Sequence, residues 1–558
     1  MTPKKRSPEI PVLNPPQFAD RATGPLPDPD GFHNTEIGRL FAYHDRTKHT
    51  YLSVRTVPHF LDWDNQPNPF RVFSGAATVP LPVPVSLPAP LFSTLRGAVS
   101  LQGTPAPWSP SRLSALLFHS LAISAWKRVR GTDFRYSLRV NPSSGNLHPT
   151  EAHLALRGTE GLPAGLYHYR AMDHVLECRR QGSALETLAV LLGQPAVAQA
   201  ELALVLSSIF WRESWKYRDR AYRYCLHDMG HAMASVALAA RGLGAHVRVL
   251  GHFSDLPLAE FLGVTLQDEG PLLVIVLNGP RPEPARTGQS GASWRDLVGP
   301  LQGKPNVLST EEVPYHLLVG MHQSTLLPDP PGLVPASLAP APDLLQREQQ
   351  LMPLASALTS EPPLDRIVRR RRSALDFDST PRLSLGDLGT ILFHATRALS
   401  ADFLPPPAPL SPTRHSLITL YLYVNRVTGL EPGVYRYRPD RHQLVLLKQG
   451  DVAGRAAFLS LEQELGAHAC VTFSMVADLE RAAASFGNRG YRYAHIEAGF
   501  IGHGLYLGAE GTGWNATGIG AFYDDDVHQF LELKPEQGQV IYHFAIGRAV
   551  HDDRILSS

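Results

Sequence analysis

The chain has 558 residues, of which 43% are hydrophobic, and its 52 Lys and Arg residues nearly balance 51 Asp and Glu residues. This composition predicts a globular protein with a sizeable core and excludes a disordered scaffold. The balanced charge excludes recruitment of nucleic acid or of an anionic membrane by an overall electric field.

Three widely spaced cysteines without a CxxC pair favour a reducing compartment over a disulfide framework. No apolar segment follows the basic first residues, and no apolar run approaches the roughly 18 residues of a membrane helix. We therefore expect a cytoplasmic protein without a signal peptide or a membrane span.

The sequence contains an internal repeat, visible as pairs of similar words at nearly one spacing. The pairs are GLYHYR at Gly165 and GVYRYR at Gly433, YRY at Tyr222 and Tyr491, and GHFSD at Gly251 and GAFYD at Gly520, separated by 268, 269 and 269 residues. Upstream, LLFHS at Leu116 and ILFHA at Ile391 are 275 residues apart. The second copy therefore lacks about six or seven residues of the interval in which the first copy carries PSSGN.

Both copies predict the same order of elements. Helical periodicity predicts helices over residues 113–122 and 385–396, and apolar β-type runs predict strands over 151–157 and 418–424. In each copy the GxYxY strand, another strand, a long helix (222–240 or 491–509), a Gly-rich segment and a closing strand follow. This order is typical of an α+β fold.

We expect the two copies to form domains over residues 96–280 and 366–558. Residues 281–365 are rich in Pro and small residues, which predicts a surface connector. Residues 1–95 belong to neither copy in this alignment and are expected to form an N-terminal extension.

Taken together, these motifs resemble the nitroreductase superfamily, and most of all its SagB/ThcOx-type azoline dehydrogenases. The resemblance rests on RVNPSSGNLHP, GLYHY, WKYRDRAYRY, GHAMASVALAARGLG, RRRRSALDF, YRYAHIEAG and GIGAFYDDD. Members of this superfamily form two-fold dimers that bind FMN in the interface. The resemblance therefore implies two fused FMN-dependent domains in a monomeric pseudo-dimer, whose two half-sites are free to diverge.

The resemblance also implies which residues bind FMN. PSSGN matches a turn that faces the flavin, and RRS matches a phosphate-binding motif, in which guanidinium groups bind phosphate in a bidentate manner. The glycines of GIG permit close backbone approach, and a late basic residue meets phosphate. The expected cofactor-binding residues are Pro142, Ser143, Ser144, Gly145, Asn146, Arg371, Arg372, Ser373, Gly518, Ile519, Gly520 and Arg548.

The two copies are complementary in these motifs. The first copy has PSSGN but keeps only Arg96 of the Arg/Ser motif, and the second has RRS without PSSGN. The second copy departs from the family pattern at Leu375, where a basic residue is expected. We therefore expect one intact FMN site, built from both halves, and one degenerate site.

The resemblance implies that Lys216 and Tyr217 are the catalytic pair, and the second copy has Ser485 and Phe486 instead. Aromatising an azoline requires removal of a proton as well as hydride transfer to the flavin. A lysine can remove that proton if burial or nearby cations lower its pKa, and Arg212, Arg218 and Arg220 are the candidate cations.

His227 and His231 have the i, i+4 spacing of a metal pair, but their counterparts are Ile496 and Phe500 and no third ligand is evident. We expect no metal site.

The sequence favours an FMN-dependent dehydrogenase that acts on an azoline-type or other peptide-derived substrate, with oxygen as a candidate electron acceptor. One alternative is an NAD(P)H-dependent nitro-, ene- or quinone reductase. Another is a non-catalytic flavin-binding scaffold.

Overall fold

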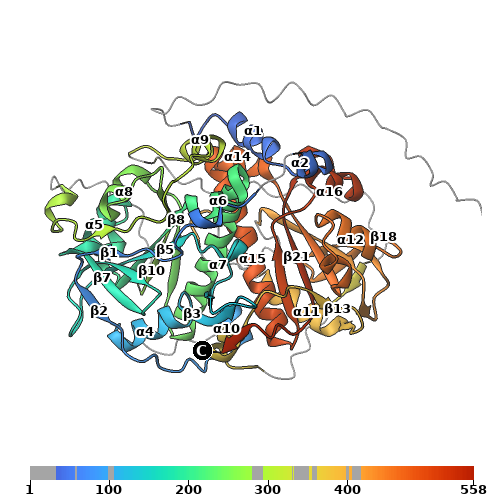
Figure 1. Cartoon of the computed structure of the whole chain (residues 1–558), viewed down its shortest axis with the longest axis horizontal. Coiled ribbons are helices and arrows are strands. Elements are labelled where there is room, and N and C mark those ends of the chain that lie inside the picture. The colour runs from blue at the N-terminus through green and yellow to red at the C-terminus, as the bar shows by residue number, and fades with distance from the viewer. Residues whose placement is uncertain are drawn as a thin grey trace, which may run out of the picture.

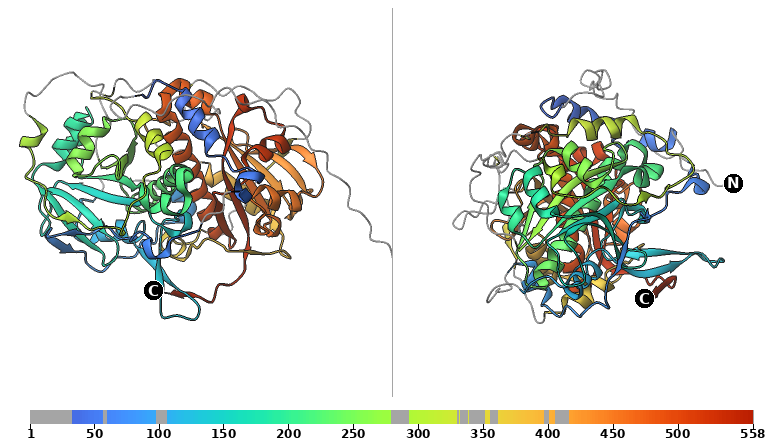
Figure 2. Two further views of the ribbon diagram at one scale, coloured as in Figure 1. Left: turned by 45° about the horizontal axis from the view of Figure 1, so that its top comes forward. Right: turned by 90° about the vertical axis from the view of Figure 1, so that its left-hand side faces the viewer.

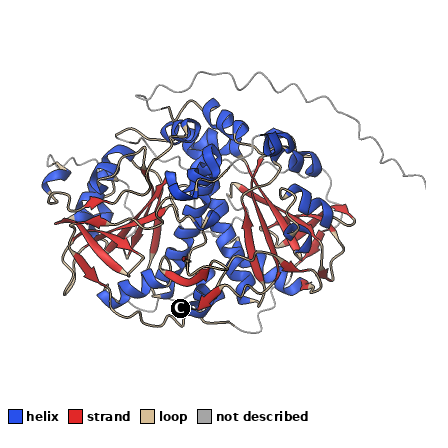
Figure 3. Cartoon of the chain, in the orientation of Figure 1, coloured by secondary structure: helices blue, strands red, loops and turns tan. Residues whose placement is uncertain are grey.

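The computed structural model describes residues 33–56, 60–97, 106–278, 293–329, 331, 338, 351–354, 361–396, 401–404 and 416–557. Two α+β halves, each with a central antiparallel sheet, lie on either side of two long helices (Figures 1 and 3). Much of the predicted connector lies outside the described residues. Within the described part of the chain, no helix is long and apolar enough to cross a membrane.

The first half is built on a seven-stranded sheet with the order β2-β7-β6-β5-β8-β10-β9. Every residue of the middle strands β5, β8 and β10 is buried, because helices cover both faces of the sheet. The strands are β2 (Thr78–Pro80), β5 (Thr150–Leu156), β6 (Gly165–Arg170), β7 (Val175–Gln181), β8 (Leu202–Ile209), β9 (Val247–Leu250) and β10 (Glu269–Leu277). The covering helices are α5 (Ala184–Leu191), α8 (Asp255–Leu262) and α7 (Ala221–Gly242).

The second half repeats this plan with the order β12-β18-β17-β15-β19-β21-β13, and β20 pairs with β21. Its strands are β12 (Leu351–Pro353), β13 (Phe377–Asp378), β15 (Ile418–Val424), β17 (Gly433–Arg438), β18 (Gln443–Gln449), β19 (Val471–Ala477), β20 (Asn515–Ile519) and β21 (Gln539–Ala549). The helices that pack on it include α12 (Ala453–Leu459), α13 (Leu465–His468), α15 (Gly490–Gly511) and α16 (Asp524–Leu531), and α11 (Leu385–Ala395) packs on α15. The α+β prediction and the fused two-domain arrangement are confirmed.

Three small sheets complete the structure. A hairpin of β3 (Ile123–Arg128) and β4 (Arg135–Arg139) projects from the body beside the C-terminus, as Figure 2 shows, and β22 (Ile555–Ser557) adds a third strand to it. The two-stranded pairs are β1 (Phe73–Ser74) with β11 (Lys304–Pro305), and β14 (Leu383–Ser384) with β16 (Val427–Thr428).

The structure assigns more of the chain to the repeat than the sequence alignment did. Helix α1 (Gly38–Arg46) packs against α9 (His316–Ser324), and α3 (Leu91–Leu95) lies near α10 (Leu364–Arg370). Pro90, which precedes α3, and Pro363, which precedes α10, form a β-bridge with each other. Strands β2 and β12 occupy the same edge position in the two sheets. The predicted extension and connector therefore contain the first elements of each copy, which share too few identical residues to align.

The two halves are held together by the crossing of α7 and α15. Each helix is buried over nearly its whole length. A Cβ on Gly230 would lie 2.1 Å from the carbonyl oxygen of Ile496, and a Cβ on Gly499 would lie 2.2 Å from that of His227. Glycine is needed at both positions because the backbones approach too closely for any side chain.

Two buried ion clusters related by the pseudo-two-fold flank this crossing. Arg220 and Arg223 of the first half bind Asp524 of the second at 3.0 and 2.8 Å. In the cluster related to it by the pseudo-two-fold, Arg489 and Arg492 bind Asp255 at 2.7 and 2.9 Å. The backbone N–H groups of His49 and Leu327, which follow α1 and α9, donate to the same two carboxylates.

The arginines of the first cluster keep Asp524 ionised. Although burial raises the pKa of Asp524, Arg220 and Arg223 outweigh it and lower that pKa to about 2. The ionised carboxylate is therefore available to bridge the halves at neutral pH.

Replacing Gly499 with alanine should lower the free energy of unfolding by about 1 to 3 kcal/mol, because the two helices must move apart. Chemical denaturation followed by circular dichroism measures this change. Gly454→Ala in α12 is the matched control, since no atom lies within 4 Å of its new Cβ. Equal stability of the two variants would show that the crossing tolerates a side chain.

Candidate functional site

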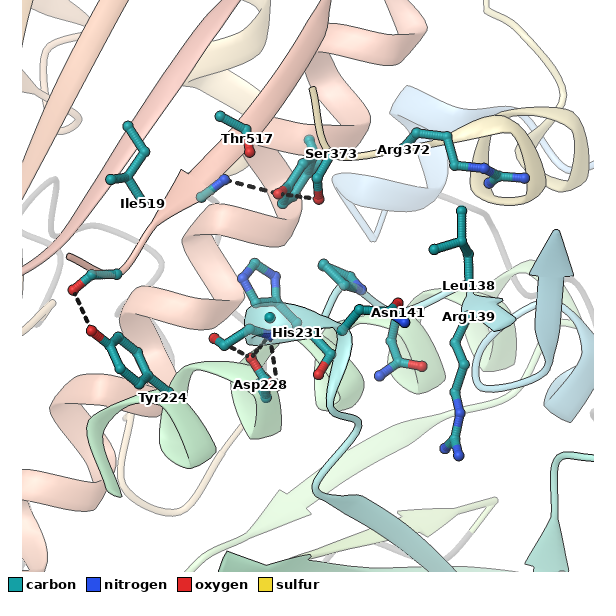
Figure 4. Close-up of a pocket in the computed structure, with 18 of the residues that line it drawn as sticks. Leu138, Arg139, Asn141, Tyr224, Asp228, His231, Arg372, Ser373, Thr517 and Ile519 are labelled. Carbon is teal, nitrogen blue, oxygen red and sulfur yellow. Dashed lines mark hydrogen bonds between the residues drawn. The ribbon is translucent and has the colours of Figure 1, made fainter. Parts of the chain in front are cut away.

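A cavity of about 420 Å³ lies between the two halves. The first half contributes the turn at residues 141–148 and one face of α7, and the second half contributes residues 371–375 and β20 with the residues that follow it. Figure 4 shows Asp228 and His231 on one side of this space and Ser373, Thr517 and Ile519 on the other. The predicted turn and the predicted Arg/Ser motif therefore meet in one cavity.

The PSSGN turn is fixed from behind by α7. The backbone N–H and the hydroxyl of Ser144 donate to Asp228 at 3.0 and 2.9 Å. The Ser143 hydroxyl accepts the backbone N–H of His148 at 2.8 Å. Gly145 has a φ of 57°, a left-handed conformation that favours glycine. These contacts explain why one turn needs so many special residues.

The predicted reactive pair lies at the end of α6 (Phe210–Tyr217), against this turn. A Cβ on Gly145 would lie 2.7 Å from the Tyr217 hydroxyl and 3.3 Å from Lys216 Nζ. Both polar groups therefore reach the turn, and Tyr217 lines the cavity. The Tyr217 and Tyr224 rings pack with their centroids 4.4 Å apart.

Arg371, Arg372 and Ser373 all line the cavity. Arg371 donates to the carbonyls of Val140 and Arg139, which attaches the second half to the first. Arg372 donates to three carbonyl oxygens, including that of Ser124 at 3.1 Å. Arg371 and Arg372 are therefore part of the interface.

Gly518, Ile519 and Gly520 also line the cavity, but side chains of the protein explain the two glycines. A Cβ on Gly518 would lie 2.0 Å from the Tyr542 hydroxyl, and one on Gly520 would lie 2.1 Å from the Tyr224 ring. Arg548 does not line the cavity. Its guanidinium lies over Trp514 and donates to the Gly513 carbonyl at 2.6 Å.

Several cavity residues were not predicted from the sequence as cofactor or catalytic residues. The Tyr542 hydroxyl and His231 Nε2 are hydrogen-bonded at 3.1 Å, and the Tyr506 hydroxyl binds Ser373 at 2.8 Å. Comparing the two copies could have identified these residues, because the residues at the equivalent positions of the other copy are apolar. His231, Tyr506 and Tyr542 correspond to Phe500, Ala237 and Leu273.

The arginines expected to influence Lys216 are largely engaged elsewhere. Arg212 is buried against Glu151, and Arg220 bridges to Asp524. A buried carboxyl group lies one turn before Lys216 instead. Burial raises the pKa of Glu213 well above its usual range, and the nearby Asp228 raises it further.

The donor set at the interface suits a phosphorylated, partly aromatic cofactor. Within the described part of the chain, Arg371 Nη1, Asn141 Oδ1 and His231 Nδ1 are buried without a hydrogen-bond partner. Each belongs to a residue that lines the cavity. Buried polar atoms are rarely left unpaired, so these three point to a polar ligand. Together with the cavity tyrosines, they fit FMN.

Comparison with known proteins identifies relatives of the chain. The model of the nitroreductase family matches residues 115–279 and 368–548, which together make up more than half of the chain. A crystal structure of a nitroreductase-like protein from Anabaena variabilis superimposes with a TM-score of 0.71 and 26% identity, over 92% of this chain and 99% of that one. The tandem arrangement therefore recurs in a solved structure.

Curated relatives match parts of the chain. MJ1384 of Methanocaldococcus jannaschii, named as a nitroreductase, is 33% identical over 31% of this chain and 85% of its own. The microcin B17-processing protein McbC of Escherichia coli is 32% identical over 29% of this chain and 61% of its own. The trifolitoxin-processing protein TfxB of Rhizobium leguminosarum is 34% identical over 18% of this chain and 29% of its own.

Asp228 should make stability depend on pH. Burial raises its pKa from 3.8 to about 7 in the folded protein. The folded state then holds a proton that the unfolded state releases, so this contribution is complete below pH 3.8 and is lost as pH rises through about 7.

The slope of this loss approaches about 1.4 kcal/mol per pH unit between the two pKa values. Asp228→Asn should flatten the dependence of the free energy of unfolding on pH in that range, measured by chemical denaturation at several pH values. Parallel curves for the variant and the wild type would contradict the assignment.

Proposed function

Because the chain belongs to the nitroreductase family, a family of oxidoreductases, we propose that it is an FMN-dependent dehydrogenase of peptide-derived heterocycles. One observation carries the proposal. The Tyr217 side chain, the PSSGN turn and the Arg/Ser motif converge on one cavity between the halves, and Lys216 Nζ reaches the same turn at Gly145.

FMN would be held by both halves. Arg371 and Arg372 would bind its phosphate through bidentate, charge-assisted hydrogen bonds. Ser144 and Asn141 would contact it from the first half, and Tyr542 would do so from the second. When bound, FMN supplies a hydride acceptor.

Side chains of the protein would remove the proton from the substrate ring. Burial raises the pKa of Tyr217 well above its usual range, so its hydroxyl stays protonated and can donate a hydrogen bond to the substrate. This leaves Lys216 Nζ, beside the same turn, as the candidate base for the proton on the ring carbon. The bond from that carbon to its proton breaks, and the electron pair remains to form the new double bond of the aromatic ring.

The names of two relatives support a peptide-derived substrate. McbC and TfxB are processing proteins for microcin B17 and trifolitoxin. The chain spans 61% of McbC and 29% of TfxB. An azoline ring in a peptide would lose a hydride and a proton in one dehydrogenation.

An NAD(P)H-dependent reductase is the second candidate, favoured by the match to 85% of MJ1384. Anaerobic addition of NADH or NADPH to the purified yellow protein separates the candidates. Rapid bleaching of the flavin supports the reductase, and flavin that stays oxidised supports the dehydrogenase. Protein that purifies without any flavin contradicts both enzyme candidates.

Lys216→Ala should retain flavin but lower substrate turnover at least about 100-fold, the lower range for loss of a general base. Turnover of an azoline-containing peptide and the flavin absorbance of the purified variant are the two measurements. Ser485→Ala, at the equivalent position of the second copy, should turn over normally. Normal turnover by Lys216→Ala would remove the assigned base.

Arg372→Ala should weaken FMN binding by about 1.5 to 3 kcal/mol, the range for a hydrogen bond to a charged group. Titration of the flavin-free protein with FMN, followed by fluorescence quenching, gives the dissociation constant. Arg96→Ala is the control, because this residue is 38% exposed and lies 3.5 Å from Glu361. Equal losses in both variants would contradict a single phosphate site.

A further inference from the structure

The pseudo-two-fold predicts a second cleft, equivalent to the cavity but with the roles of the halves exchanged. The residues that line the cavity at Thr517, Gly520, Ala521 and Tyr224 have counterparts 269 positions away in sequence. These counterparts are Arg248, Gly251, His252 and Tyr493. The hydrogen bonds around these residues are the same in both places. Beside the cavity, Arg220 donates to the Tyr224 hydroxyl and to the Gly520 carbonyl. In the second cleft, Arg489 donates to the Tyr493 hydroxyl and to the Gly251 carbonyl.

Residues 401–404 of the second half lie in this second cleft. The Asp402 carboxylate accepts the backbone N–H groups of Gly251 at 2.8 Å and His252 at 3.2 Å. The Asp402 N–H donates to the Val249 carbonyl at 3.1 Å, which extends the contact along β9. A carboxylate of the protein itself therefore accepts hydrogen bonds from two adjacent backbone amides.

The residue after Asp402 places an aromatic ring in the same cleft. The Phe403 ring stacks on the Tyr493 ring with a centroid distance of 4.4 Å and an angle of 8° between the planes. Phe403 is fully buried. A Cβ on Gly251 would lie 2.8 Å from both rings, so the stack fits tightly against the glycine backbone.

Burial raises the pKa of Asp402 from 3.8 to about 6, although the two amides and Arg248 act in the opposite direction. Among the described residues, the two terminal nitrogens of Arg248 are buried without a hydrogen-bond partner. Arg248 and Asp402 lie close enough that the carboxylate raises the pKa of the guanidinium, although burial lowers it more. The cleft thus offers two amides, one cation and a flat aromatic surface.

We propose that the second cleft is a binding site for an aromatic carboxylate and that Asp402 and Phe403 are its built-in occupant. This inference rests on the pseudo-symmetry and the contacts of residues 401–404, and it does not depend on the proposed dehydrogenase activity. It makes the second cleft a structural joint between the halves and leaves one cavity for FMN in each chain.

The equivalent segment of the first copy takes a different course. The stretch between α4 (Pro110–Phe118) and β5 forms the β3–β4 hairpin, which projects from the body, and then the PSSGN turn (Figure 2). The stretch between α11 and β15 contains Ala401 to Leu404, which insert into the second cleft. One segment therefore borders an open cavity while its counterpart fills the equivalent space.

Chemical rescue tests the proposal. The Asp402→Ala, Phe403→Ala double variant of the full chain should melt at a lower temperature than the wild type. Phenylacetate, which carries a ring and a carboxylate, should raise the melting temperature of the variant by roughly 5 °C at saturation, because a ligand of the folded state stabilises it. The wild type should not respond.

Fragments and a second variant separate the contributions. Acetate or toluene alone should restore less than phenylacetate in the double variant. If that variant does not fold, Phe403→Ala keeps the carboxylate and should respond to toluene. Phe261→Ala, a fully buried position in the first half, is the control, and phenylacetate should stabilise it no better than toluene.

Absence of any rescue in either Asp402/Phe403 variant would overturn the proposal. So would two molecules of FMN released from each wild-type chain, since the occupant leaves room for one. A chain without flavin would instead overturn the proposed function and leave the rescue experiment decisive for the second cleft.

Discussion

The close crossing of α7 and α15 is the constraint on which the rest of the structure depends. Gly230 and Gly499 bring the two backbones into contact, and each crossing helix carries an Arg pair that reaches an Asp of the opposite half. Buried ion pairs contribute little net stability but strongly disfavour any arrangement that leaves one charge unpaired. The position of one half on the other is therefore fixed. Because both halves line the cavity, the positions of its lining residues are fixed as well.

Within this frame, three polar residues of the cavity have apolar counterparts on the other side of the pseudo-symmetry. His231, Tyr506 and Tyr542 surround the cavity, whereas Phe500, Ala237 and Leu273 take the equivalent places. The same loss of symmetry lets Asp402 and Phe403 enter the other cleft. A homodimer could not separate these roles, because one sequence would have to serve both positions.

The sequence predicted the α+β repeat, the fusion and the meeting of PSSGN with the Arg/Ser motif, because these depend on periodicity and on contiguous words. It did not place α1 and α9 in the repeat, since their equivalence is carried mainly by His44 and Thr47 against His322 and Thr325. Asp228 was missed because its role depends on a turn 84 residues away. The sequence also could not show that Tyr542 and Tyr224 occupy the space that a Cβ on Gly518 or Gly520 would need, since these side chains come from distant elements.

Joining the two halves in one polypeptide changes how the assembly responds to dilution. In a dimer of separate chains, the interfacial site is lost when the concentration falls below the dissociation constant. Here the partner half is always present at the high local concentration that a covalent tether provides. A scarce protein can therefore keep a composite site intact, and its two halves cannot exchange with those of a related chain in the same cell.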